Sequence, residues 1–186
     1  MTETAAAVIV MADTIHIAVR SIPAGAQKVA GYVTGSSDVR WTAEDWARFN
    51  GVKVGINQMA GSDPLLGDVF DVEPGAWSIK EAAQASRERQ AHGLEVSLYT
   101  SQSLATPLVK ACFAVGVTSG NLWVANWNLS QAEATAIVMH RHQPWPVQAV
   151  QWAQGSDPNA LIPSSDPMLA TYNLSVTAPS WPTGAA

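Results

Sequence analysis

Residues 67–75 have the sequence Gly-Asp-Val-Phe-Asp-Val-Glu-Pro-Gly, which predicts a short strand that ends at two carboxylates. Side chains alternate between the two faces of a strand, so Val69, Asp71 and Glu73 share one face. We expect the Cα atoms of Asp71 and Glu73 to lie about 6.5–7 Å apart, which is two strand rises. At that separation one negative charge raises the pKa of the other carboxyl. A carboxyl that stays protonated near neutral pH can act as a general acid.

Strands and helices alternate on both sides of this stretch. Two capping boxes, Ser78 to Glu81 and Ser130 to Glu133, predict helices that run to about residues 92 and 140. Further helices are expected from Thr42 and over residues 101–115. The apolar run at residues 8–19 and the periodicity of the chain predict additional strands at residues 28–34, 52–58, 94–100, 121–127, 147–153 and 169–176.

This order predicts the architecture. Alternating strands and helices indicate a parallel sheet, and seven or eight strands favour a small irregular (β/α) barrel of the TIM type over an open doubly wound sheet. No strand is followed by a glycine-rich phosphate loop, which argues against a nucleotide-binding sheet. We expect one domain over residues 1–177 and a flexible tail over residues 178–186. In such a barrel the strand ends that carry Glu73 and Trp127 would meet at the active site.

Composition limits the classes of protein that fit this chain. Its 186 residues are 47% apolar and 13% charged, which indicates an ordered domain with a sizeable core. The net charge of −5 comes without a basic stripe, so we expect neither nucleic acid nor an anionic membrane as partner. The single cysteine, Cys112, excludes an internal disulfide framework.

The N-terminal segment does not have the pattern of a signal peptide or a membrane span. Its apolar patch at residues 5–12 is short, follows Glu3 rather than a basic residue, and ends at Asp13. If the substrate lies outside the producing cell, we therefore expect release by lysis or packaging in a virion.

No metal and no cofactor is expected. The four histidines have no partners at ligand spacing, and the acidic residues around Asp63 and Asp68 lack the loop pattern of a calcium site. The chain also lacks the Gly-x-Ser-x-Gly motif of serine hydrolases.

Four motifs in order resemble glycoside hydrolase family 25, the lysozyme family that cleaves peptidoglycan with an irregular β/α barrel. Members carry an Asp-x-Glu strand end, a Tyr-Thr-Ser strand end, a Leu-Trp-x-Ala strand and a Trp-Gln strand. The corresponding residues here are Asp71-Val72-Glu73, Tyr99-Thr100-Ser101, Leu122-Trp123-Val124-Ala125 and Val150-Gln151-Trp152-Ala153-Gln154. The resemblance covers roughly residues 28 to 176, and chains of this short type look like lysozyme-like proteins encoded by phages of actinobacteria.

The resemblance implies roles for individual residues. Glu73 would be the general acid, and Asp71 would assist charge development or position the N-acetyl group of the substrate. Tyr99, Trp127 and Gln151 would line the sugar groove. Apart from the resemblance, we expect the aromatic side chains of Tyr32 and Trp152 to contribute to the same groove. The implied partners are cell-wall glycan and other structural proteins of a phage particle.

Two departures from the family pattern keep other functions open. The family has an Asp shortly after a Gly in its first strand, but Gly31 is followed by Tyr32 and no nearby carboxylate. A later family Asp could correspond only to Asp157 or Asp166. The alternative is therefore a catalytically inactive barrel that binds saccharide or serves as a structural protein of a virion. A cytoplasmic sugar-processing enzyme ranks third because no phosphate site is visible.

A purely structural role for the two carboxylates also stays open. Asp71 and Glu73 could cap the following helix, or they could pair with an arginine such as Arg87 or Arg89.

Overall fold

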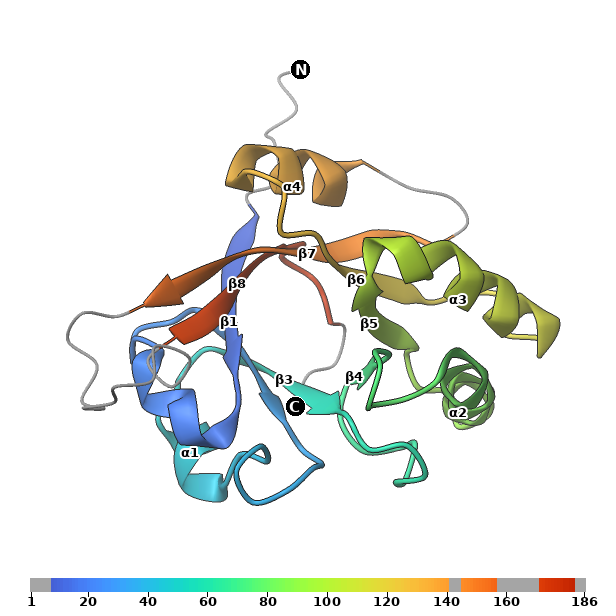
Figure 1. Ribbon diagram of the computed structural model, residues 1–186, viewed down its shortest axis with the longest axis horizontal. Coiled ribbons are helices and arrows are strands. Elements are labelled where there is room, and N and C mark those ends of the chain that lie inside the picture. The colour runs from blue at the N-terminus through green and yellow to red at the C-terminus, as the bar shows by residue number, and fades with distance from the viewer. Residues whose placement is uncertain (1–7, 141–144, 157–170, 183–186) are drawn as a thin grey trace.

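The computed structural model describes residues 8–140, 145–156 and 171–182. Its eight strands form one closed barrel in chain order, with the helices outside the ring (Figure 1). The predicted small α/β barrel is thus confirmed. The strands are β1 (Ile9–Thr14), β2 (Lys28–Tyr32), β3 (Val52–Asn57), β4 (Val69–Asp71), β5 (Ser97–Ser101), β6 (Asn121–Ala125), β7 (Val147–Ser156) and β8 (Thr171–Thr177).

One strand departs from the parallel order. Each strand from β1 to β6 pairs in parallel with the next, whereas β8 is antiparallel to both β7 and β1. We call the end of the barrel at which β1 to β7 finish the carboxyl end, and the opposite end the amino end. Because β8 runs in reverse, its first residues lie at the carboxyl end.

The helices are η1 (His16–Ser21), α1 (Ala43–Ala47), α2 (Ile79–Ala91), α3 (Gln102–Ala114) and α4 (Gln131–Met139). The four α-helices begin where the sequence predicts. The run at residues 8–19, predicted as one strand, instead ends as a strand at Thr14 and continues as η1. Reciprocal capping boxes open α1, α2 and α4, so the side chain of each N-cap and the acid three residues later satisfy each other's backbone N–H groups. Gly93, with a φ of 73°, follows the end of α2 as predicted.

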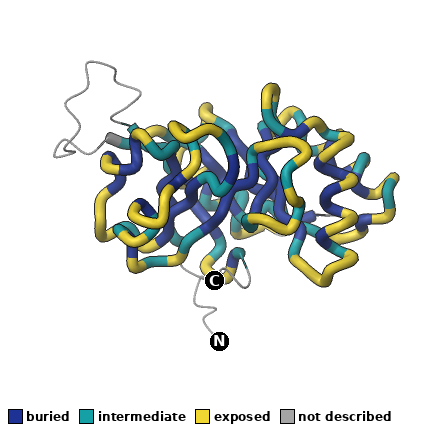
Figure 2. The backbone as a smooth tube through the Cα atoms, turned by 90° about the horizontal axis from the view of Figure 1, so that it is seen from below, coloured by how far each residue is buried: buried dark blue, intermediate teal, exposed yellow. Residues whose placement is uncertain are grey.

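Two layers of apolar side chains hold the barrel together. The interior is filled by a cluster that includes Met11, Val54, Trp123 and Trp181. A second cluster packs α2 and α3 against the outer faces of β4 to β6. Figure 2 shows the buried backbone in the middle of the molecule and the exposed segments around it.

The segment after β8 corrects the prediction of a loose tail. Residues 178–182 close the amino end of the barrel, and we call them the C-terminal plug. Trp181 is only 2% exposed, and its indole N–H donates to Ser97 Oγ at 3.0 Å. The ammonium of Lys28 donates to the backbone carbonyls of Ala178 and Trp181. The proline and glycine content suggests looseness, but burial of the indole overrides it. Residues 183–186 lie outside the described residues.

Candidate functional site

Three carboxyl side chains meet at the carboxyl end of the barrel. Asp71 is the last residue of β4, Asp13 is the next-to-last residue of β1, and Glu73 lies in the connection between β4 and α2. The strand is two residues shorter than predicted because the chain turns after Asp71. At this turn the backbone N–H of Trp77 donates a hydrogen bond to the carbonyl of Asp71 at 3.1 Å. The negative charge of Glu73 contributes to the raised pKa of both Asp13 and Asp71, and the charge of Asp13 contributes to that of Asp71.

Asp13 is held by two amide side chains. Gln151 Nε2 donates to both carboxylate oxygens at 3.1 and 3.2 Å, and Asn173 Nδ2 donates to Oδ2 at 3.0 Å. The antiparallel register of β8 places Asn173 directly opposite Asp13. Burial raises the pKa of Asp13 to about 6, and the two amide donors oppose that rise.

Asp71 is buried without comparable support. It is 3% exposed, and its Oδ1 atom has no hydrogen-bond partner. Burial raises the pKa of Asp71 to about 7, with further contributions from the negative charges of Glu73 and Asp13. A buried oxygen without a hydrogen-bond partner lowers the stability of the folded protein. Groups of this kind are often found at functional sites.

Glu73 is more accessible than its two neighbours. Partial burial raises the pKa of Glu73, and a hydrogen bond with Tyr99 opposes the shift. The Tyr99 hydroxyl also lies 2.7 Å from Gln151 Oε1. Tyr99 and Gln151 therefore connect Glu73 with Asp13 across the barrel.

The structure argues against pairing of these carboxyls with an arginine. Arg89 instead donates to the backbone carbonyls of Pro64, Gly67 and Glu95 at 2.9–3.0 Å. Its guanidinium interacts electrostatically with Asp68 and Glu95. Arg87 is exposed on α2.

The predicted groove residues lie in three different places. Tyr32, Tyr99 and Gln151 lie in the barrel interior beside the carboxyls. The negative charges of the carboxyls help to raise the pKa of both tyrosines, and Gln151 donates a hydrogen bond to Asp13. Trp127 lies in the turn after β6 and is 50% exposed. Trp152 lies apart from the carboxyls, because it packs on the outer face of β7 against the cluster that contains Ala134 and Val150. Alternation explains this, since its neighbour Gln151 points inward.

Sequence analysis missed Asp13 and Asn173. The apolar run at residues 8–19 concealed Asp13, because it combines β1 with η1 and obscures the alternation of Met11 and Asp13 on one face. Asp13 lies on β1, the first strand of the barrel. Asp157 and Asp166 lie outside the described residues.

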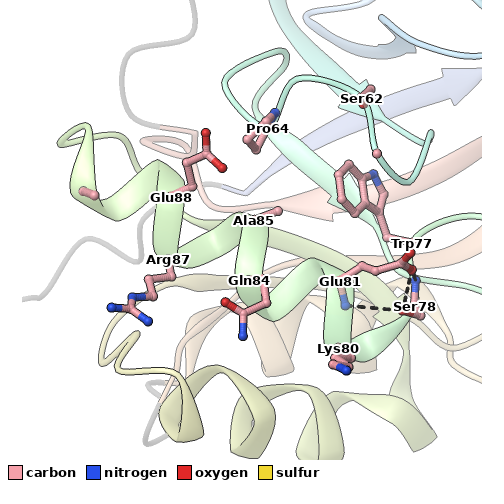
Figure 3. Close-up of a pocket in the computed structure, with 12 residues that line it drawn as sticks. Ser62, Pro64, Trp77, Ser78, Lys80, Glu81, Gln84, Ala85, Arg87 and Glu88 are labelled. Carbon is pink, nitrogen blue, oxygen red and sulfur yellow. Dashed lines mark hydrogen bonds between the residues drawn. The ribbon is translucent and has the colours of Figure 1, made fainter.

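A wide surface groove lies elsewhere. It has a volume of about 860 Å³ and lies between α2 and the connection from β3 to β4, with Lys80, Gln84, Arg87 and Glu88 along one wall (Figure 3). Its lining is mixed in charge and includes none of the three carboxyls. An apolar groove of about 600 Å³ lies between α3 and α4 on the outer surface. We place the candidate site at the carboxyls because perturbed acids, rather than volume, indicate chemistry.

The arrangement can supply both a proton and negative charge. Carboxyls that repel one another in a buried site do not all ionise near neutral pH, so one can donate a proton while another stays charged. The described residues contain no group of three or more histidine, cysteine or acidic side chains arranged to hold a metal ion. Among the same residues, no helix is long and apolar enough to cross a membrane.

Comparison with known proteins finds no matching family model, no matching curated protein and no matching solved structure.

Proposed function

We propose that this barrel is a lysozyme-like glycoside hydrolase that acts on the glycan of bacterial peptidoglycan. The observation that carries the proposal is the convergence of Asp13, Asp71 and Glu73 at the carboxyl end of the barrel, where two of them have a pKa raised to about 6 and 7. The resemblance of the strand-end motifs to glycoside hydrolase family 25 supplies the class of substrate.

Glu73 is the residue best suited to donate the proton. It lies in a connection rather than in a strand, it is half-buried, and its raised pKa favours the protonated form. Protonation of the glycosidic oxygen by a carboxylic acid releases the leaving sugar and leaves positive charge on the ring that remains.

Asp13 and Asp71 would stabilise that positive charge in different ways. Asp13 receives hydrogen bonds from Gln151 and Asn173, which favour its ionised form. Asp71 has a buried oxygen that lacks a donor. The N–H of a sugar acetamido group is a donor of the kind that this oxygen lacks, so Asp71 is suited to position an N-acetylated substrate.

The inactive barrel is the second candidate, and it loses its main support. It was favoured by the absence of a first-strand carboxylate after Gly31, but Asp13 on β1 supplies a carboxylate at this end of the barrel. Association with a phage particle and action outside the producing cell stay predictions.

The test is release of reducing ends from purified peptidoglycan by the wild type, Glu73→Gln and Glu88→Gln. Glu88 is an exposed residue of α2 in the outer groove, so it is a matched control for the loss of one negative charge. We expect Glu73→Gln to lose at least about 100-fold in rate while Glu88→Gln keeps wild-type activity. No hydrolysis by the wild type, or equal activity in Glu73→Gln, would refute the proposal.

A further inference from the structure

The apolar groove between α3 and α4, which we call the α3–α4 groove, follows from how these two helices pack. α3 packs against α2, β5 and β6, whereas α4 packs against β7 and β8 (Figure 1). The helices therefore leave a gap between them over the outer faces of β6 and β7. Leu122 and Val124 face outward there, because Trp123 between them points into the barrel. Val150 does the same, because its neighbour Gln151 points inward.

One face of α3 forms a wall along the whole groove. The residues of this face recur three or four positions apart, as one side of a helix requires, and they are Gln102, Ala105, Thr106, Val109, Lys110 and Phe113. The two ends of the groove differ. At the first turn of α3 the side chains of Gln102 and Asn126 are hydrogen-bonded to each other. At the last turn Phe113 packs edge-on against Trp145, with 6.5 Å between the ring centroids.

Trp145 has a hydrogen-bond donor without an acceptor at this second end. Its side chain is buried, and its Nε1 atom has no hydrogen-bond partner in the part of the chain that the structure describes. The opposite end of the indole lies against Gly120, where an added Cβ would be 2.5–2.9 Å from Cζ3, Cη2 and Cε3. The N–H edge therefore faces away from Gly120, and the ring lines the groove. A buried donor without an acceptor destabilises the protein, so a ligand that supplies the acceptor gains a contact without breaking another.

Lys110 supplies the charge of the groove. It is the only charged side chain among the described lining residues, it is exposed, and no described residue forms an ion pair with it. Lys110 precedes Phe113 by three residues, so it lies about 4.5 Å from Phe113 along the helix axis. The cation and the unpaired N–H of Trp145 thus belong to the same end of the groove. Both are donors of the kind that bind a carboxylate.

The rest of the groove suits the apolar chain of a small molecule. Its volume of about 600 Å³ lies within the range of about 300–1,000 Å³ that is typical of small-molecule sites. Between its two ends the walls are aliphatic, with Val109, Val124 and Ile137 among them. Such walls offer no partners to the backbone of an extended peptide, which needs a hydrogen bond at each N–H and C=O group. A hydrocarbon chain needs none.

We propose that the α3–α4 groove binds a free long-chain carboxylate of the fatty-acid class. The carboxylate accepts hydrogen bonds from Lys110 and from the indole N–H of Trp145, and the chain extends past Val109 toward Gln102. The site lies on the outer surface, whereas Asp13, Asp71 and Glu73 lie inside the barrel. The inference therefore goes beyond the proposed glycosidase activity and does not depend on it.

Calorimetric titration with hexanoate, octanoate and decanoate, each below its micelle concentration, tests the chain. Affinity should rise about 3–4-fold with each methylene, which corresponds to about 0.8 kcal/mol for each buried CH₂. Decyltrimethylammonium has the same chain length and the opposite charge, and it should bind about 5-fold more weakly than decanoate.

Two lysine variants test the charge. Lys110→Gln should weaken decanoate binding about 3–5-fold, because the ammonium is exposed and its contribution is screened by water. The matched control is Lys80→Gln, which removes the same charge from an exposed position on α2 outside the α3–α4 groove. It should leave the affinity for decanoate at the wild-type value.

The indole N–H of Trp145 gives a direct signal. In a ¹H–¹⁵N spectrum the indole resonance that is missing from Trp145→Phe belongs to Trp145. Saturating decanoate should move this resonance downfield as its hydrogen bond forms, whereas decyltrimethylammonium should not.

Filling the groove tests its position. Ala105→Phe places a larger side chain in the groove from α3, and Ala114→Phe makes the same change at an exposed position of α3 outside it. We expect Ala105→Phe to weaken decanoate binding at least about 10-fold and Ala114→Phe to bind as the wild type does. Circular dichroism verifies folding, and if Ala105→Phe does not fold, Lys110→Gln and the Trp145 resonance decide.

An affinity that does not depend on chain length, or a Trp145 resonance that does not move at saturation, would overturn the site. Equal binding of decanoate and decyltrimethylammonium would indicate adsorption of any amphiphile and would overturn it too. These results leave the proposed glycosidase activity untouched, because that activity is tested separately with Glu73→Gln.

Discussion

The two ends of the barrel interior both bury charge, and they treat it in opposite ways. At the amino end Lys28 is fully buried, and its ammonium donates to Thr177 Oγ1, Ala178 O and Trp181 O. At the carboxyl end Asp71 is nearly as buried, but one of its oxygens has no partner. Burial lowers the pKa of Lys28 to about 8 and raises that of Asp71 to about 7.

The difference separates structure from function. The amino end satisfies its buried cation with neutral oxygens and covers it with the C-terminal plug, as a group kept for stability requires. The carboxyl end keeps several acids that destabilise one another, and its proposed catalytic role gives a reason to retain them. The comparison predicts that changes at the two ends will affect stability with opposite signs.

The largest effect is expected at the amino end. Trp181→Ala should lower the free energy of unfolding by about 3–5 kcal/mol, because a buried indole that packs on Trp123 leaves a cavity. Urea denaturation measures the change. A loss below about 1 kcal/mol would contradict the stabilising role of the amino end, since the C-terminal plug would then not close the barrel in solution.

At the carboxyl end, stability should decrease as pH rises. Asp13 and Asp71 have folded pKa values of about 6 and 7 against a reference of 3.8, so the folded state retains protons that the unfolded chain releases. Stability is therefore greatest below about pH 4 for these groups and is lost as pH rises through 6 and 7.

Asp71→Asn should remove part of the stability loss with rising pH, because an amide does not ionise. Relative to the wild type, the variant should gain on the order of 2 kcal/mol of stability between pH 4 and pH 7.5. Denaturation curves at several pH values test this. A stability difference that does not change with pH would mean that Asp71 ionises normally in the folded protein.

Lys28→Met should have a smaller effect of opposite sign. It leaves three oxygens without their donor but relieves the burial of a charge, so we expect a net loss of about 1–2 kcal/mol at pH 7. Because the pKa of Lys28 is about 8 in the folded protein and 10.5 in the unfolded chain, the unfolded chain binds more protons than the folded protein between these two pH values. Wild-type stability therefore gains over that window, and the advantage over Lys28→Met should grow from pH 8 to pH 10.

The smallest effect on stability is expected at Trp127. Trp127→Ala should change the free energy of unfolding by less than about 0.5 kcal/mol, because the side chain is half exposed. Trp152→Ala should cost more, since that ring packs against the cluster around α4. If Trp127 stacks on sugar, Trp127→Ala raises KM for peptidoglycan while Trp152→Ala does not. The reverse outcome would place the glycan outside the barrel mouth.

Local signals explain why much of the fold could be predicted. The capping boxes of α2 and α4 depend on residues three apart, and the alternation of strands with helices predicts a barrel without any knowledge of distant contacts. The direction of β8 is a different kind of property. It depends on pairing with both β7 and β1, which no local pattern in residues 171–177 encodes.

The candidate site can be predicted only as far as local sequence signals reach. Asp71 and Glu73 can be predicted because they lie at and just after the end of a strand with a clear pattern, and Tyr99 because it begins the motif Tyr99-Thr100-Ser101 within β5. Asp13 required knowing that β1 closes the barrel against β8, and Asn173 required the reversed direction of that strand. Burial of Trp181 likewise depends on the barrel interior, not on the composition of the C-terminal segment.

Closure of the barrel by β8 also has a consequence for how the chain folds. The amide of Asn173 that supports Asp13 is 160 positions away in sequence, and the contacts between β1 and β8 are among the longest-range in the molecule. Contacts of such high sequence separation slow folding, because the entropy of a long loop is lost before the pairing is gained. During synthesis, β1 must therefore wait for β8 to leave the ribosome. The proposed acid chemistry then begins only after the last strand has joined the first.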